Sequence, residues 1–148
     1  MILCGIDPGA NGSITIFDGN EIYFRDYKTK GLLSYIELLT TYPPDLCIVE
    51  KVHSMPGQGV SSTFSFGQRL GEIEGMLMTL NVPYQLVLPR VWQKNLGLKP
   101  KATKKDIASV LLKLYPHAQL YGAKGGLLDG RSDSLGLLHY ARTTYNVL

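Results

Sequence analysis

Short apolar segments separated by tight turns open the chain, and this pattern constrains the fold more than any other feature of the sequence. Residues 2–6 form a largely apolar run, residues 13–17 alternate in polarity, and residues 21–27 return after an Asp-Gly-Asn turn at 18–20. Runs of this length are typical of buried and half-buried strands, and a turn of this kind between two strands favours a hairpin. The sequence therefore predicts three antiparallel strands at the start of the fold.

Segments with helical spacing alternate with strand-like segments in the rest of the chain. Apolar side chains repeat at helical spacing from Leu32 to Leu39, Pro43-Pro44 ends this helix, and a wholly apolar strand follows at 46–49. A strand that is reached through a helical crossover is usually buried and parallel to its neighbour. The pattern then predicts a helix capped by Ser61 or Ser62 and ending near Leu80, a strand at 84–88, a short helix from Pro89, a helix capped by Thr103 and a last helix from near Ser132.

These segments predict one α/β domain over residues 1–148, with a mixed five-stranded sheet (three antiparallel strands, then two parallel) and helices on both faces. The composition, 45% hydrophobic and 18% charged, is that of an ordinary globular domain. No apolar run approaches the roughly 20 residues of a membrane span, and the N-terminus lacks the basic segment of a signal peptide. Cys4 and Cys47 lie inside apolar strands, so we expect buried free thiols in a reducing cytoplasm.

Basic residues concentrate in the second half of the chain, although the formal net charge is only +3. Residues 1–84 hold five Lys/Arg and nine Asp/Glu, whereas residues 85–148 hold ten Lys/Arg and three Asp/Glu. Six basic residues and no acid occur from Arg90 to Lys105. Such an asymmetry favours a polyanionic partner, most often nucleic acid, although a run of charge is also typical of a plain solvated surface.

Two carboxylates follow apolar strands. Asp7 comes directly after the run at 2–6, and Glu50 comes directly after the run at 46–49. An aspartate before Pro-Gly is also a common turn former, but glutamate is a poor strand former, and an unpaired buried carboxylate takes up a proton or finds a cation. If the two strands are parallel neighbours, Asp7 and Glu50 lie at the same edge of the sheet.

A second pair of acids, Asp129 and Asp133, lies at the start of the last helix. A single acid there is explained by a helix cap or by the helix dipole, whereas two acids four residues apart are suited to holding a metal. Together with Asp7 and Glu50 they form an oxygen-only ligand set, which suits Mg²⁺ or Mn²⁺ and neither zinc nor copper. Two such ions about 4 Å apart activate water and stabilise the leaving oxygen in phosphodiester hydrolysis.

Four short motifs give the chain a resemblance to a known family. They are Gly-Ile-Asp-Pro-Gly at 5–9 followed by Gly-Ser at 12–13, Ile-Val-Glu at 48–50, Phe-Gly-Gln-Arg at 66–69 and Gly-Arg-Ser-Asp-Ser at 130–134. In this order and spacing they resemble the RuvC-type Holliday junction resolvases, most closely the short forms of bacteriophages and prophages, over nearly the whole chain. The resemblance implies a ribonuclease H-like fold, a homodimer and Mg²⁺-dependent paired nicks across four-way DNA junctions inside a bacterial cell.

The resemblance also assigns the acids. Asp7, Glu50 and Asp133 match the family's catalytic, metal-binding carboxylates by position. Many members have an acid or a histidine three residues before the last aspartate, where this chain has Gly130. We expect Asp129, one residue earlier, to take that place as the fourth ligand.

DNA contacts are expected on both sides of these acids. Lys104 matches a lysine that is important for activity in the family, and His53 matches a loop aromatic that stacks on junction bases, although an imidazole stacks more weakly. Exposed bases at a junction centre favour stacking contacts, and phosphates favour basic side chains. The further contacts that we predict are Lys94, Lys99, Lys101, Lys104 and Lys105 to phosphates, Gln68 and Arg69 to the backbone, Met55, Gln58 and Phe64 at the junction centre, and Arg131 to DNA.

Ordinary structural roles compete with some of these predictions. Phe64 is also a candidate for the core, and for Phe66 and Trp92 we favour the core. The helix ending near Leu80 has one apolar face, which packs either on its own sheet or in part on a second copy of the chain, and Gly71 and Gly75 lie four residues apart on it. Two other side chains of this helix, Glu72 and Glu74, are expected to face solvent.

Three other functions fit parts of the pattern. The same chemistry with looser selectivity would cut replication forks, flaps and other branched DNA. A non-catalytic junction-binding protein would not need the four acids. ATP-binding proteins of the actin and sugar-kinase superfamily also open with Asp-x-Gly after a strand, but this chain is too short for their two lobes, and Glu50 and Asp133 would have no role. We therefore expect neither a nucleotide cofactor nor a membrane.

Overall fold

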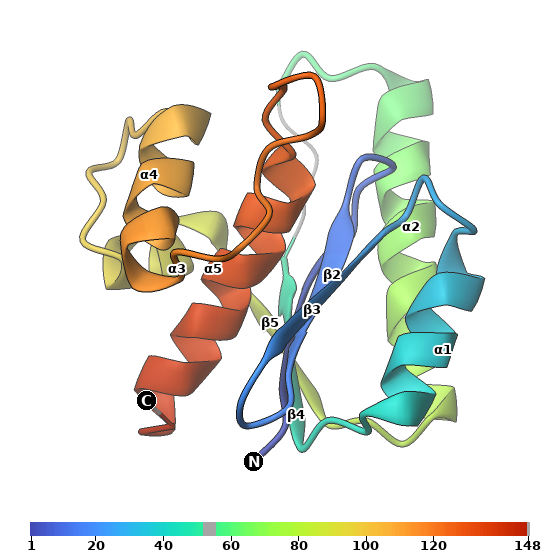
Figure 1. The fold of residues 1–148 in the computed structure, drawn as a ribbon. Helices are drawn as coiled ribbons and strands as arrows, with labels where there is room; N and C mark the ends of the chain where they lie inside the picture. The colour runs from blue at the N-terminus through green and yellow to red at the C-terminus, as the bar shows by residue number, and fades with distance from the viewer. Residues whose placement is uncertain (52–55, 148) are drawn as a thin grey trace.

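A five-stranded sheet forms the centre of the computed structural model, which describes residues 1–51 and 56–147 (Figure 1). The strand order is β3-β2-β1-β4-β5. β1 pairs antiparallel with β2 and parallel with β4, while β2–β3 is antiparallel and β4–β5 is parallel. The predicted mixed sheet is therefore confirmed, with strands β1 (Leu3–Asp7), β2 (Ser13–Phe17), β3 (Ile22–Asp26), β4 (Leu46–Glu50) and β5 (Tyr84–Val87).

Helices cover both faces of the sheet, as predicted (Figure 1). One face carries α1 (Leu32–Thr41) and α2 (Val60–Thr79). The other face carries α5 (Asp129–Thr144), which packs directly on β1, β2 and β4. Outside α5 lie α3 (Pro89–Asn95) and α4 (Lys104–Leu114).

The period-two alternation of the strands divides the core into two clusters. Leu3 and Ile48 belong to the cluster beneath α5, whereas Cys4 and Cys47, both buried with free thiols as predicted, belong to the cluster beneath α1 and α2. Successive side chains of a strand point to opposite faces, so every second residue returns to the same face. The last residues of β1 and β4 therefore turn to the face that α5 covers.

Helix starts agree with the sequence in part. Pro89 is at the first turn of α3, and Thr103 caps α4 in a capping box with Asp106. The predicted serine cap of α2 is wrong, because the helix begins earlier, with Gly59 as its N-cap and no side-chain cap bond. The last helix also begins three residues before the predicted Ser132, because the Leu128 carbonyl already accepts bonds from the backbone N–H groups of the helix's first turn.

Three side-chain placements on α2 differ from the predictions. Phe66 is 42% exposed rather than in the core, because the first turns of α2 extend past the end of the sheet (Figure 1). Glu72 is half-buried in an ion pair with Arg69, and Glu74 accepts a hydrogen bond from the Tyr84 hydroxyl, so neither faces solvent freely. Within the described ranges, every helix is too short or too polar to cross a membrane.

Candidate metal-binding active site

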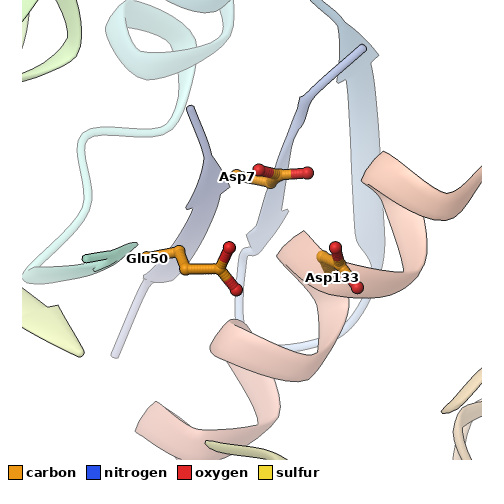
Figure 2. A group of neighbouring side chains, drawn as sticks. All are labelled: Asp7, Glu50 and Asp133. Carbon is orange, nitrogen blue, oxygen red and sulfur yellow. The ribbon is translucent and has the colours of Figure 1, made fainter. Parts of the chain in front are cut away.

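Three carboxylates that are far apart in the sequence converge at one edge of the sheet (Figure 2). Asp7 ends β1, Glu50 ends the neighbouring parallel strand β4, and Asp133 lies in the first turns of α5. One oxygen from each lies within 4.8 Å of the other two. The strand register explains the convergence, because parallel neighbours bring their carboxyl ends to the same edge of the sheet and α5 begins above it.

Burial and mutual repulsion disfavour ionisation of this group. Burial raises the pKa of Asp7 well above its ordinary value, and the charges of Asp133 and Glu50 raise it further. Burial, followed by the charge of Asp133, raises the pKa of Glu50 to about 7. Burial also raises the pKa of Asp133. Three carboxylates that resist ionisation at such short range form a site that a cation stabilises by cancelling the repulsion.

Lys104 of α4 supplies a counter-charge within the chain. Its Nζ lies 2.8 Å from Oδ2 of Asp133, and this ion pair holds the pKa of Asp133 below the level that burial alone would give. The other oxygen of Asp133, Oδ1, is buried and accepts no hydrogen bond from the residues that the structure describes. A buried oxygen without a donor is costly, and a metal ion is a suitable partner for it. The donor set is all carboxylate, which suits a hard divalent cation such as Mg²⁺.

Asp129 lies one turn before Asp133 but outside the group of three ligand oxygens. The charge of Asp129 raises the pKa of both Asp7 and Asp133, so Asp129 lies close enough to act on them electrostatically. Gly130, at the position where the resembling family has an acid or a histidine, packs against the turn after β1. A Cβ there would lie 2.2 Å from the Asn11 carbonyl oxygen, so no side chain fits at this position. The role of Asp129 as a fourth ligand remains a prediction.

Trp92 contacts the site in a way that the sequence did not indicate. It is fully buried, as predicted for a core residue, and its indole Nε1 donates a hydrogen bond of 2.9 Å to Oε2 of Glu50. This bond lowers the pKa of Glu50 and so opposes the effect of burial. No sequence signal links two residues 42 positions apart, and the contact arises only because α3 follows β5, the neighbour of β4.

A second ion pair fixes the start of α5. Nε and Nη2 of Arg131 bind the two carboxylate oxygens of Asp26 at 2.9 and 2.8 Å, and Asp26 also accepts a bond from the Ser13 hydroxyl. Ser13 is the register partner of Asp7 across β1 and β2. No motif in the sequence indicates Asp26, whereas Arg131 is predicted from the sequence as a DNA contact. In the structure Arg131 forms an ion pair with Asp26 of the same chain. Its contact with DNA stays a prediction.

The remaining predicted DNA contacts differ in their exposure and in their partners within the chain. Arg69 is occupied by Glu72 and the Tyr27 hydroxyl, whereas Phe64 is 71% exposed. Gln58 is half-buried and bonds to Ser62. His53 and Met55 lie outside the described residues. Besides Phe64, the exposed members of the set are Gln68, Lys94, Lys99, Lys101, Lys104 and Lys105.

No protein-family model matches the sequence, and no curated protein matches it. Solved structures do match. RuvC of Thermus thermophilus, in complex with a Holliday junction substrate, has a TM-score of 0.68 and 14% identity over 99% of this chain and 98% of that chain. The resolvase of Fowlpox virus, in complex with Holliday junction DNA, has a TM-score of 0.62 and 21% identity over 98% and 99% of the two chains. The yeast mitochondrial Holliday junction resolvase has a TM-score of 0.51 and 15% identity over 99% and 84%.

These likenesses establish the fold. The chain has the ribonuclease H-like fold of RuvC and poxvirus Holliday junction resolvases, as the motif resemblance implied. Likeness covers almost the full length of both RuvC and the Fowlpox virus protein, so the sheet and the helices that hold the three carboxylates are all part of the shared fold.

Proposed function

We propose that this chain is a metal-dependent endonuclease that hydrolyses phosphodiester bonds in four-way DNA junctions by paired nicks. One observation carries the proposal: Asp7, Glu50 and Asp133 converge at one sheet edge, in a fold whose matching solved structures include Holliday junction resolvases. The unpartnered Oδ1 of Asp133 and the raised pKa values support a cation at this place. A protein that only bound junctions would gain nothing from burying three mutually repelling acids.

The proposed ligands are Asp7, Glu50 and Asp133, with Asp129 as the fourth. Mg²⁺ is the expected ion, Mn²⁺ is the alternative, and two ions per site fit the number of oxygen donors. When bound, the ions supply an activated water and stabilise the leaving oxygen. The chain itself contributes rigid placement of the carboxylates, and Lys104, with its Nζ 2.8 Å from Oδ2 of Asp133, favours the ionised form of that carboxyl against the effect of burial. With a cation held by Asp133, the half-exposed Lys104 side chain would be available to a DNA phosphate.

DNA binding is proposed for the basic surface that follows β5. Lys94, Lys99, Lys101 and Lys105 are all exposed, and phosphate contacts of this kind position DNA without reading its sequence. The place of action that fits this substrate is the cytoplasm of a bacterial cell, on host or phage DNA.

A homodimer is proposed through the outer face of α2. Val60, Phe64 and Met78 are exposed there by 89%, 71% and 61%, on the same helical stripe as Gly67 and Gly71. Exposed apolar side chains in one stripe favour a protein partner, and glycine allows close approach of a second helix. A two-fold pair of chains would place two active sites on a two-fold symmetric junction, which paired nicking requires.

The test compares junction cleavage by the wild type, Glu50→Gln and the matched control Glu37→Gln, which alters an exposed glutamate on α1. End-labelled four-way junction and linear duplex are incubated with and without Mg²⁺. We expect paired nicks in the junction alone, no cleavage without metal, a loss of more than about 100-fold in Glu50→Gln and no change in Glu37→Gln.

Three results would change the proposal. Equal cleavage of forks and flaps would broaden the substrate to branched DNA in general. Tight junction binding without cleavage in Mg²⁺ or Mn²⁺ would favour an architectural protein. Full activity of Glu50→Gln would remove the three carboxylates from the chemistry.

A further inference from the structure

We propose that Trp92 is a positioning residue of the metal site: its indole N–H fixes the Glu50 carboxylate and leaves one oxygen of that carboxylate for the ion. This inference rests on the proposed function, and it assigns a role to a residue outside the set of acids. The role differs from that of a core side chain, which would matter only for stability.

The hydrogen bond itself is the first support. The indole Nε1 is a donor only, and a buried donor without an acceptor is costly. Trp92 is fully buried, and its Nε1 donates a hydrogen bond of 2.9 Å to Oε2 of Glu50. Glu50 extends from β4 toward Asp7 and Asp133 (Figure 2), so the bond restrains the rotation of the same carboxylate that faces the other two acids. Hydrogen-bonded partners of ligating carboxylates orient them for the metal.

The indole cannot easily move, which makes it suitable for positioning. α3 begins at Pro89, directly after β5, and the last residue of β5, Val87, is the register partner of Glu50. On its other side the ring lies against Gly136 of α5, where an added Cβ would lie 2.4 Å from ring atom Cζ3. Any side chain at that position would therefore displace the indole.

Trp92 thereby contacts two of the three elements that bring acids to the site, β4 and α5. Its N–H holds Glu50 at the end of β4, and its ring packs on α5 three residues after Asp133. A rigid bicyclic side chain between the two fixes the distance between strand-borne and helix-borne carboxylates. We therefore expect the N–H group and the ring shape of Trp92 to make separable contributions to the placement of the Glu50 and Asp133 carboxylates.

The experiment uses the fact that the chain contains one tryptophan. Biosynthetic replacement of tryptophan by β-(3-benzothienyl)alanine alters Trp92 alone, keeps the bicyclic shape and replaces the N–H by sulfur. Mn²⁺ binding is measured by calorimetry on the full chain without DNA, beside thermal unfolding without metal. We expect Mn²⁺ affinity to fall about 10-fold in the analogue, within the range for lost partners of metal ligands, and an equal fall in cleavage at limiting Mn²⁺ that excess Mn²⁺ restores.

The outcomes separate this inference from the proposed function. Wild-type Mn²⁺ affinity in a folded analogue would overturn the positioning role and leave Trp92 a core residue. Wild-type protein that binds Mn²⁺ but leaves junctions uncut would overturn the proposed substrate, and the analogue's Mn²⁺ affinity would still decide the role of Trp92. Wild-type protein that binds no Mn²⁺ would overturn both the metal site and the positioning role.

Discussion

Glycine has opposite surroundings on the two faces of the sheet. Beneath α5, a Cβ added to Gly5 of β1 would lie 2.2 Å from the backbone oxygen of Ser134 and 2.6 Å from the backbone nitrogen of Leu138. On α2, a Cβ added to Gly71 or Gly75 would meet nothing within 4 Å. Gly5 has no room for a side chain because the backbones of β1 and α5 nearly touch, whereas Gly71 and Gly75 border open space.

The helices on the two faces of the sheet also differ in burial. Ten of the sixteen residues of α5 are buried, against three of the twenty residues of α2. Close backbone packing leaves α5 one position on the sheet, and that position determines where Asp133 meets Asp7 and Glu50. α2 leaves its outer face uncovered, and this is the face through which the homodimer is proposed.

The largest expected effect is that of Gly5→Ala. The new methyl group meets backbone atoms of α5 that cannot give way by changing a rotamer, so the helix must move off β1. We expect a loss of more than about 3 kcal/mol in the free energy of unfolding, measured by urea denaturation. A loss below about 1 kcal/mol would mean that α5 shifts freely on the sheet, and the comparison between the two faces would then fail.

The sequence predicted what depends on local pattern and on strand order. Alternation in 13–17 and the apolar run in 46–49 identified two strands, and the order of strands and helices placed Asp7 and Glu50 at one edge of the sheet. Prediction failed where distant elements pack. Nothing local in the sequence indicates that position 130 has no room for a side chain, that Trp92 bonds to Glu50, or that Arg131 pairs with Asp26.

The errors on α2 have the same origin. An exposed helix position and a position facing a neighbouring element look alike in a single sequence, so Glu74 was assigned to solvent although Tyr84 lies within hydrogen-bonding distance. The core position predicted for Phe66 is wrong because the sheet ends before the helix does.

The pH dependence of stability without metal is expected to come from the α5 face. Glu50 has a pKa of about 7 in the folded chain, above its ordinary value of 4.5. Between these values the unfolded chain ionises first, so folded stability falls as pH rises through this window and stays low above it. At about 1.4 kcal/mol per pKa unit, we expect metal-free protein to be about 2–3 kcal/mol less stable at pH 8 than at pH 5, and Glu50→Gln to reduce the difference.

A control on the other face sharpens this prediction. Glu74→Gln removes one carboxylate of α2 that lies outside the group of three, and it is the matched control for Glu50→Gln. Mg²⁺ should stabilise the wild type more at pH 8 than at pH 5, because metal ligands must be deprotonated. If stability without metal rises from pH 5 to pH 8, burial and repulsion of the three carboxylates are not the dominant charge effect in the fold.

The smallest expected change concerns Gly71→Ala, and it tests whether the outer face of α2 is free or covered. A Cβ at this position meets nothing within the chain, and alanine is favoured over glycine in a helix, so the isolated chain should gain about 0.5–1 kcal/mol of stability. If a second α2 packs there, the same methyl group separates the two helices and weakens the dimer. We therefore expect a more stable chain with a higher dimer dissociation constant, measured by urea unfolding at low concentration and by sedimentation equilibrium. Ser109→Ala, on the exposed side of α4, is the control that changes helix propensity without touching this face. Equal dissociation constants for Gly71→Ala and the wild type would show that the dimer contact lies elsewhere, and the open glycines of α2 would then need another explanation.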